Sequence, residues 1–335
     1  MTQEDRLGVA VIGLGVGEQH ARAYASLPTC RVVSVSDLNR ARAERLAADL
    51  SAEVRETADV FRDPRTDIVS IASYDDDHFG QVIAALQACK HAFVEKPLCR
   101  SDAELRAVKD AWSAHGDRHV ASNLVLRAAP LYLWLREAIG SGQLGEIYAL
   151  DGDYLYGRVH KITDEWRSQV DDYSVMQGGG VHLVDLMLWL TGQRPVRVTA
   201  AGNKISTRNT AFRYADFVSA AYEFPSGLVA RITANFGCVH RHQHVLRVFG
   251  TRATFIHDDR GARLHESRSP DAVAAAVDLA PEPASKGALI PQFVDAIVAG
   301  CGARSALQGE LDVVAACVAA DRALASHEPT EIAYV

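Results

Sequence analysis

Apolar and polar positions follow two different rhythms along the chain. In the first part, short apolar runs alternate with segments whose apolar residues recur at helical spacing, as in 39–50. The runs predict strands at 9–12, 31–36, 67–73, 91–95 and 119–123, and the spaced segments predict helices at 18–26, 39–50, 80–89 and 102–115. Alternating strands and helices are typical of parallel βαβ units, so we expect an α/β Rossmann domain over residues 1–124.

After about residue 145 the pattern changes to strands that follow one another directly, at 147–157, 196–205, 217–224, 228–236, 244–249 and 253–257. Pro225-Ser226-Gly227 is a hairpin signal between two of them. We therefore expect residues 125–335 to form an α+β domain with a large, mostly antiparallel open-faced sheet. Helices are expected at 180–190, 290–299 and 311–325, and a surface excursion at 260–288. We leave open that a C-terminal segment packs back on the Rossmann domain.

Composition and charge narrow the classes of partner. The chain has 335 residues and a formal net charge of -7, without a Lys/Arg tract, so we expect no nucleic acid partner and no membrane binding. Apolar runs stay well short of the roughly 20 residues of a membrane helix. The first residues lead into an apolar strand without a signal segment. Since the six cysteines show no C-x-x-C spacing, we expect a cytoplasmic protein with reduced thiols and no structural zinc site.

A glycine-rich turn follows the first predicted strand. Gly13 and Gly15 allow a tight turn in which backbone N–H groups approach a pyrophosphate at a helix N-terminus. Asp37 ends the second strand, 22 residues after Gly15, where an acid accepts hydrogen bonds from ribose hydroxyls. An acid there repels a 2′-phosphate, so we expect NAD rather than NADP, although Arg40 nearby leaves NADP open.

The spacing of this turn is one residue short. The third glycine would fall at position 18, which is Glu18, so we expect its packing role to fall to Gly17. The alternative is a strand–turn–helix junction that binds nothing, which the surrounding βαβ pattern disfavours. The residues of this region that we expect around the dinucleotide are Gly13, Gly15, Val16, Gly17, Asp37 and Asn39.

Further motifs extend over nearly the whole chain. They include Glu95-Lys96-Pro97 at a strand end, Trp166-Arg167, and Gly178-Gly179-Gly180-Val181-His182. Together they closely resemble the glucose–fructose oxidoreductase / inositol dehydrogenase / MocA (Gfo/Idh/MocA) family. The resemblance implies a nicotinamide cofactor, sugar, cyclitol or related polyol substrates, and homodimers or homotetramers that bury the broad face of the second sheet. It also implies cofactor contacts for Ser73, His78, Glu95, Lys96, Trp166 and Arg167, and a catalytic role for His182.

Oxidation of a secondary alcohol needs a place for the carbinol carbon and a base for its proton. Lys96 follows a parallel strand at the end where α/β sheets bind ligands, and its ammonium can stabilise negative charge on the reacting oxygen. His182 is the better proton acceptor by its ordinary pKa. Asp185 shares a helix face with it and either orients the imidazole or binds substrate hydroxyls. The expected substrate residues are Asn123, Arg127, Tyr154, Tyr156, His182 and Asp185.

One position departs from the family pattern. Many members carry an aspartate four residues before the histidine, and this position is Gly178 here. Its part of the acid–base system falls to one of Asp171, Asp172, Tyr173, Tyr154 or Tyr156, or rests on Lys96 and His182 alone, or the chain does no redox chemistry.

Two clusters remain open to other interpretations. Arg158, His160 and Lys161 either meet a carboxylate or phosphate on the substrate or form a solvated loop, the interpretation that we favour. His240, His242 and His244 would share one face of a strand. Since the sequence shows no carboxylate near them, we interpret them as sheet surface, at a subunit interface, and expect no metal site.

The sequence therefore favours an NAD-dependent dehydrogenase that acts on a hydroxyl of a sugar or cyclitol. One rival is a reductase of a keto-sugar, an imine or another carbonyl, because the motifs do not fix the direction. The other is a non-catalytic dinucleotide-binding sensor or regulatory protein with the same fold. The substrate, the hydroxyl and the choice between dimer and tetramer are not written in the sequence.

Overall fold

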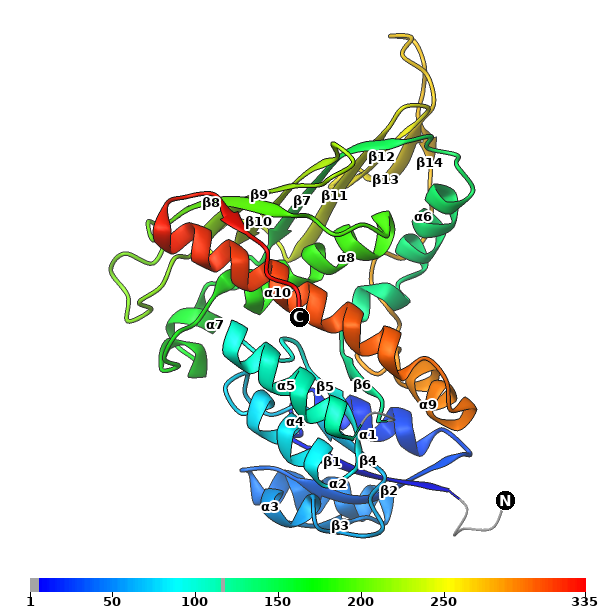
Figure 1. The fold of residues 1–335 in the computed structure, drawn as a ribbon, viewed down its shortest axis with the longest axis vertical. Coiled ribbons are helices and arrows are strands. Elements are labelled where there is room, and N and C mark those ends of the chain that lie inside the picture. Colours follow the sequence, from blue (N-terminus) through cyan, green and yellow to red (C-terminus); the bar gives the residue numbers. More distant parts are fainter. Residues whose placement is uncertain (1–5, 116–117) are drawn as a thin grey trace. The chain divides into compact units, whose positions relative to one another are not determined.

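The computed structural model describes residues 6–115 and 118–335 (Figure 1). Residues 1–5, which carry part of the expectation about a signal segment, lie outside the described ranges. The chain divides into two compact units. The first comprises Met1–Ala128, Pro283–Val314 and Val335, and the second comprises Ala129–Glu282 and Ala315–Tyr334. Each unit is thus assembled from stretches that are distant in the sequence.

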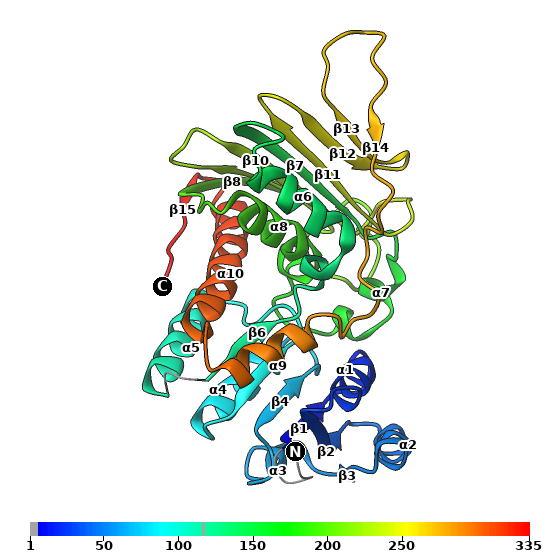
Figure 2. The same cartoon turned by 90° about the vertical axis from the view of Figure 1, so that its right-hand side faces the viewer.

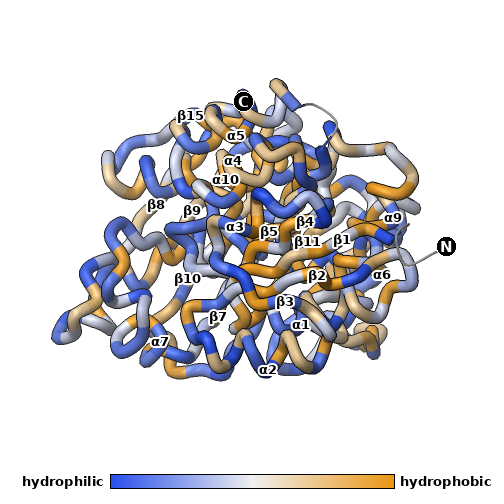
Figure 3. Tube along the Cα trace, turned by 90° about the horizontal axis from the view of Figure 1, so that it is seen from below, coloured by the Kyte–Doolittle hydropathy of each residue, from blue (hydrophilic) through white to orange (hydrophobic). Residues whose placement is uncertain are grey.

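The first unit holds a six-stranded sheet in the order β3-β2-β1-β4-β5-β6, with every neighbouring pair parallel. Its strands are β1 (Leu7–Ile12), β2 (Cys30–Ser36), β3 (Glu53–Val54), β4 (Ile68–Ile71), β5 (His91–Val94) and β6 (Val120–Ser122). Between them run α1 (Gly17–Ala25), α2 (Arg40–Leu50), α3 (Thr57–Val60), α4 (His78–Gln87) and α5 (Asp102–Ala114). This order confirms the doubly wound Rossmann sheet. The apolar character of its central strands is visible along the trace in Figure 3.

The core of this unit includes a late segment of the chain. Helix α9 (Ile290–Ala299) brings Ile290 and Phe293 into the apolar cluster that contains Val9 and Phe93. The rings of Phe93 and Phe293 are 5.3 Å apart between centroids. Helix α9 therefore supplies part of the core under the Rossmann sheet.

The second unit is built on a nine-stranded sheet in the order β14-β13-β12-β11-β7-β10-β9-β8-β15 (Figure 2). The central pair β7/β10 is parallel and the other neighbours are antiparallel. The strands are β7 (Ile147–Leu155), β8 (Arg197–Asn203), β9 (Phe217–Glu223), β10 (Val229–Asn235), β11 (Gln243–Gly250), β12 (Thr254–Asp258), β13 (Gly261–His265), β14 (Ala275–Ala276) and β15 (Thr330–Glu331). The mostly antiparallel sheet is confirmed, including the β9–β10 hairpin.

Helices cover one face of this sheet (Figure 2). They are α6 (Pro130–Gly140), α8 (Val181–Thr191) and the later part of α10 (Ala303–Ser326), and α7 (His160–Thr163) lies in a connection. On the covered face, the Tyr222 hydroxyl donates to the Ala316 carbonyl of α10 at 3.3 Å. The opposite face carries polar pairs, such as Asp153 with Arg231 at 3.0 Å. This alternation produces the open-faced sheet that the resemblance implies.

The stretch 260–288 is not wholly a surface excursion. Strands β13 and β14 lie inside it and extend the sheet at one edge, which corrects the expectation. The prolines do not prevent this, because Pro270 lies between the two strands rather than in either. Among the helices of the described ranges, none has the length and apolar character needed to cross a membrane.

Candidate functional site

The glycine-rich turn joins β1 to α1, and its three glycines have different surroundings. Gly13 has a φ of +79°, and a Cβ there would overlap the Ala72 carbonyl, so only glycine fits. A Cβ at Gly17 would lie 3.1 Å from the Val11 side chain and 3.2 Å from that of Ala72, whereas one at Gly15 would meet nothing within 4 Å. Gly17 thus provides the close packing between helix and strand that was expected of it, and the backbone at Gly15 is open for a ligand to approach.

Asp37 connects this turn to the end of β2. One carboxylate oxygen accepts from the Leu14 N–H at 2.6 Å, and the other accepts from the Asn39 N–H at 2.7 Å. The Asn39 side chain caps α2 by accepting from the Arg42 N–H at 3.1 Å. The acid therefore shapes the turn as well as standing where a ribose is expected.

The side chain of His78 contacts both of the loops that follow β4 and β5. Its Nδ1 lies 2.8 Å from the Pro97 carbonyl oxygen, its Nε2 lies 3.3 Å from that of Ser73, and the residue has no exposed surface. The Ser73 hydroxyl donates to Gln81 Oε1 at 2.9 Å. In this structure His78 holds the two loops together, and the predicted cofactor contact of its side chain stays a prediction.

Glu95 lies in a buried polar cluster at the end of β5. Its Oε1 accepts from Asn123 Nδ2 at 2.7 Å and is 3.3 Å from His20 Nε2. Burial raises the pKa of Glu95, but the hydrogen bond and charge of His20, the charge of Lys96 and the hydrogen bond from Asn123 together lower it to about 2. Glu95 is therefore an anion beside the partly exposed Lys96.

Two residues that were expected to bind substrate already have partners in the first unit. Asn123 is almost fully buried and its Nδ2 also donates to the Lys286 carbonyl at 2.8 Å. Arg127 pairs with Glu310, with 3.2 Å between Nη1 and Oε1. These contacts give both side chains a structural role, and their substrate contacts remain predictions.

His182 lies in the first turn of α8 in the second unit. It is 8% exposed, and its ring stacks with that of Tyr154 on β7 at 6.3 Å between centroids. Asp185, one turn further along, is buried. Burial raises the pKa of the Cys317 thiol on α10, and the charges of Asp321 and Asp185 add to this effect.

The three glycines before α8 make room for larger side chains. They belong to a π-helical turn, Met176–Gly180. A Cβ at Gly178 would overlap the Tyr173 hydroxyl, and a Cβ at Gly179 would overlap the Tyr154 ring. Of the proposed replacements for the missing aspartate, Tyr173 is thus the one whose polar group fills the space beside position 178. Asp171 is 92% exposed in its side chain and pairs with Arg213 at 2.6 Å.

Aromatic rings and cations surround Tyr154. Tyr156 stacks on it at 5.9 Å, and the Arg158 guanidinium lies 4.8 Å from the centroid of the Tyr156 ring. Burial, with Tyr156 and Tyr173, raises the pKa of Tyr154, and the charges of Arg158 and Arg167 partly oppose this. Arg158 thus packs against an aromatic ring, whereas Lys161 forms an ion pair with Glu165 at 2.9 Å.

The expectation about the three histidines is wrong in two respects. Only His244 lies in β11, where it pairs with Tyr154, and His240 and His242 precede the strand. A carboxylate also lies beside them, because Glu282 Oε1 is 3.0 Å from His244 Nδ1. Since 38 residues separate this pair, no spacing rule on the sequence could have indicated it.

The Arg167 guanidinium lies over the Trp166 ring, 4.4 Å from the centroid of that ring.

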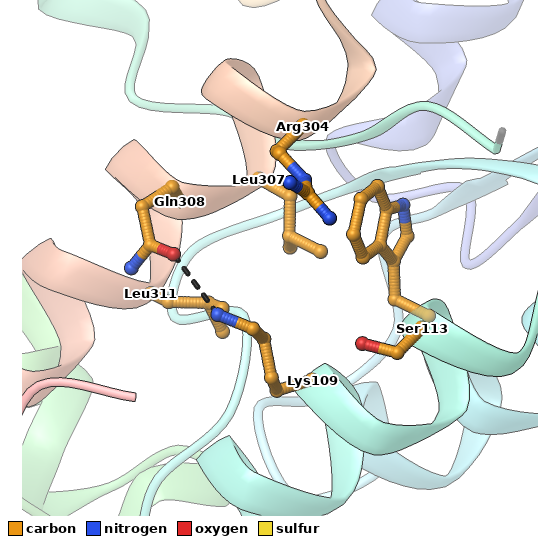
Figure 4. Close-up of a pocket in the computed structure, with 7 residues that line it drawn as sticks. Lys109, Ser113, Arg304, Leu307, Gln308 and Leu311 are labelled. Carbon is orange, nitrogen blue, oxygen red and sulfur yellow. Dashed lines mark hydrogen bonds between the residues drawn. The ribbon is translucent and has the colours of Figure 1, made fainter. Parts of the chain in front are cut away.

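A separate cavity of about 270 Å³ lies in the first unit between α5 and the start of α10 (Figure 4). Lys109 borders it and donates to Gln308 Oε1 at 3.0 Å, and Arg304 lies on the α10 side. None of the residues that line it is an expected site residue, so it is a different feature from the candidate site.

Two family profiles match the chain. Residues 7–123 match the oxidoreductase family with an NAD-binding Rossmann fold, and residues 132–256 match the GFO/IDH/MocA C-terminal domain. Inositol 2-dehydrogenase 1 of Saccharopolyspora erythraea is 30% identical over 62% of this chain and 61% of its own length. Inositol 2-dehydrogenase of Rubrobacter xylanophilus is 27% identical over 75% of this chain and 71% of its own. The first of these alignments thus spans about three fifths of the relative's length.

A solved structure of levoglucosan dehydrogenase in complex with NADH and levoglucosan has the same fold. It superposes with a TM-score of 0.84 over 98% of this chain and 99% of the other, at 21% sequence identity. At this identity the likeness shows the fold alone.

Proposed function

Because the chain belongs to the Gfo/Idh/MocA family of NAD-binding oxidoreductases, we propose that it is a dehydrogenase that transfers a hydride between a nicotinamide and a CH–OH carbon of a cyclitol or sugar. The glycine-rich turn carries this proposal. Gly13 is the residue that the turn requires, the Gly15 backbone is open, and Asp37 holds the Leu14 amide. These features fit a dinucleotide. Inositol and levoglucosan dehydrogenases among the similar proteins support the polyol class.

NAD is proposed over NADP on electrostatic grounds. The Asp37 carboxylate at the end of β2 would lie near a 2′-phosphate and repel it, whereas it can accept from ribose hydroxyls. The two N–H groups that it already accepts, from Leu14 and Asn39, fix its position and leave lone pairs on both oxygens. The exposed Arg40 pairs with Glu44 at 2.9 Å, so it has a local partner.

The proposed chemistry gives separate roles to Lys96 and His182. The cofactor, when bound, accepts or gives the hydride. Lys96 stabilises negative charge on the reacting oxygen, and its charge helps to lower the pKa of the neighbouring Glu95. His182 takes the hydroxyl proton as general base. Tyr173 provides a hydroxyl next to position 178 that can hydrogen-bond within this system, in place of a carboxylate.

The test combines cofactor binding with turnover. We expect saturable NADH fluorescence enhancement, and NAD reduction with at least one member of a cyclitol and sugar panel. Lys96→Ala and His182→Ala should each lower kcat by at least about 100-fold with NADH affinity retained. Lys109→Ala and His240→Ala serve as matched controls, and neither should lower kcat.

Three outcomes would contradict the proposal. Unchanged turnover in both variants would refute the assigned roles. NADH binding without turnover in either direction would favour the sensor. Activity only with NADH and a keto-sugar or imine would favour the reductase.

We also propose a homodimer or homotetramer in the cytoplasm. The open face of the second sheet supports the assembly, and six cysteines without disulfides support the location. Sedimentation of wild type and of Arg231→Glu, which reverses a charge on that face, tests the assembly. A wild-type protein that sediments as a monomer at all concentrations would contradict it.

A further inference from the structure

Glu282 and His244 form a carboxylate–imidazole pair in the second unit. The distance between Nδ1 and Oε1 is 3.0 Å, His244 is 4% exposed, and the Glu282 side chain is about half exposed. An ionised carboxylate only accepts hydrogen bonds, so Nδ1 must be the nitrogen that carries the proton. In the neutral ring the lone pair is then on Nε2. Glu282 thus selects the tautomer of His244.

The second nitrogen of His244 is a buried acceptor. His244 Nε2 has no hydrogen-bond partner among the residues that the structure describes. A buried acceptor that stays unsatisfied is costly, so such an atom usually meets water or a ligand. Unlike the partly exposed His240, which pairs with Asp259, His244 has its imidazole in the interior. The unsatisfied lone pair on His244 Nε2 therefore points to a hydroxyl donor.

The surroundings of the ring match a ligand that carries hydroxyl groups on a carbon ring. Three rings surround His244, with centroid distances of 5.3 Å to Tyr154, 5.7 Å to His182 and 4.9 Å to His242. Aromatic faces pack against the C–H faces of sugars and cyclitols, and a few placed polar atoms fix the orientation. His182 is the proposed base, so His244 lies directly beside the group that handles the proton.

We propose that His244 Nε2 accepts a hydrogen bond from a substrate hydroxyl, and that Glu282 is the positioning residue that holds His244 in the accepting tautomer. This inference rests on the proposed dehydrogenase function and adds a specificity-determining pair to it. The ligand class is a polyol ring with a hydroxyl adjacent to the reacting carbon. The pair contributes to substrate affinity and choice, whereas hydride transfer depends on Lys96 and His182.

A metal ion is the alternative occupant. His242, His244 and Glu282 each offer one ligand atom, and these atoms lie within 4.8 Å of one another. Two histidines and a glutamate can hold zinc with one open position. The half-exposed Glu282 and the direct Nδ1 contact favour the hydrogen-bonded pair, and zinc binding is an outcome of the test.

The experiment uses the full-length protein with His244→Gln, Glu282→Gln and Glu282→Ala, and with His240→Gln and Asp259→Asn as the matched exposed pair. Long-range ¹H–¹⁵N spectra of histidine-labelled protein report the tautomer without any need for turnover. KM and kcat are measured for the best polyol and for each of its monodeoxy analogues. NADH affinity and zinc affinity are measured by titration.

We expect the Nδ1–H tautomer of His244 in the wild type and its loss in Glu282→Ala. KM should rise about 10- to 100-fold in His244→Gln and less in Glu282→Gln, with kcat within about 3-fold. With the wild type, one monodeoxy analogue should have a higher KM than the full polyol. This difference should disappear only in His244→Gln. The affinity for NADH should be the same in the wild type and in every variant. If the wild type did not bind NADH at all, that result would refute the cofactor proposal and not this inference.

An Nε2–H tautomer in the wild type would overturn the inference, as would equal KM values in all variants. Submicromolar zinc binding that is lost in both His244→Gln and Glu282→Ala would replace it with a metal site.

Discussion

Gly178 offers a direct test of the packing before α8. Glycine in a helical turn is normally less stable than alanine by about 0.5–1 kcal/mol, so Gly178→Ala would stabilise the protein if space were free. Here the added Cβ would overlap the Tyr173 hydroxyl and lie 2.8 Å from Cζ of that ring. Overpacking of this kind costs about 1–3 kcal/mol. We therefore expect a net loss of about 1–2 kcal/mol in the free energy of unfolding.

A double-mutant cycle isolates the contact. In the Tyr173→Phe background the overlapping oxygen is absent, and the penalty of Gly178→Ala should shrink by about 1 kcal/mol. Gly309→Ala in α10 is the matched control, because its Cβ would meet nothing within 4 Å, and it should stabilise by about 0.5–1 kcal/mol. Tyr173→Phe alone provides the baseline for loss of the hydroxyl.

Urea unfolding followed by circular dichroism measures the free energies, and thermal melts check them. For a unit of this size, a loss of about 1–2 kcal/mol corresponds to a drop of about 2–8 °C in Tm. If Gly178→Ala stabilises like Gly309→Ala, or if its effect is additive with Tyr173→Phe, Tyr173 does not occupy the space beside position 178. The choice of Tyr173 over the other replacements would then fail.

Three further predictions concern single carboxyl groups. Asp37→Ala should weaken NAD binding about 10-fold, because the variant loses the ribose acceptor and the hydrogen bond to the Leu14 amide. It should also reduce the preference for NAD over NADP, because the repelling charge is gone. Equal NAD and NADP affinities in the titrations of wild type and variant would contradict this. The lowered pKa of Glu95, about 2, means that its stabilisation relative to Glu95→Gln is present above pH 4.5 and declines as the pH falls toward 2, which urea unfolding at several pH values measures. Burial raises the pKa of Asp321 to about 6 against a hydrogen bond from Gln177, so wild-type stability should fall as the pH rises from about 4 to 6, and a slope that survives in Asp321→Asn would refute the assignment.

The regular elements were predictable because their signals are local. The strand–helix alternation of the first part and the Pro225-Ser226-Gly227 hairpin depend on neighbours in the sequence, and both appear in the structure. The short elements β3 and α3 carry too few residues for a periodic signal. The sequence pattern did not indicate strands β13 and β14, because Pro270 lies in the loop that joins them.

The features of the candidate site were likewise predictable only where their signals are local in the sequence. The roles of Gly13 and Gly17 in the turn followed from local spacing, whereas the contacts of His78 and Arg127 are made by tertiary partners that no spacing reveals. The same holds for the meeting of His244 with Glu282, which depends on how β11 and a distant loop pack. Tyr173 was among the alternatives for the missing aspartate, but only the packing against Gly178 distinguishes it.

The late arrival of α9 in the first core has a consequence for synthesis on the ribosome. The N-terminal stretch up to Ala128 contains all six parallel strands, yet Ile290 and Phe293, which complete their apolar cluster, are made some 160 residues later. A nascent chain therefore exposes the cluster that contains Phe93 while eight of the nine strands of the second sheet, β7 to β14, are being translated. The domain that is encoded first cannot complete its core until most of the second has been translated, and a chain cut short before α9 is a natural substrate for chaperones.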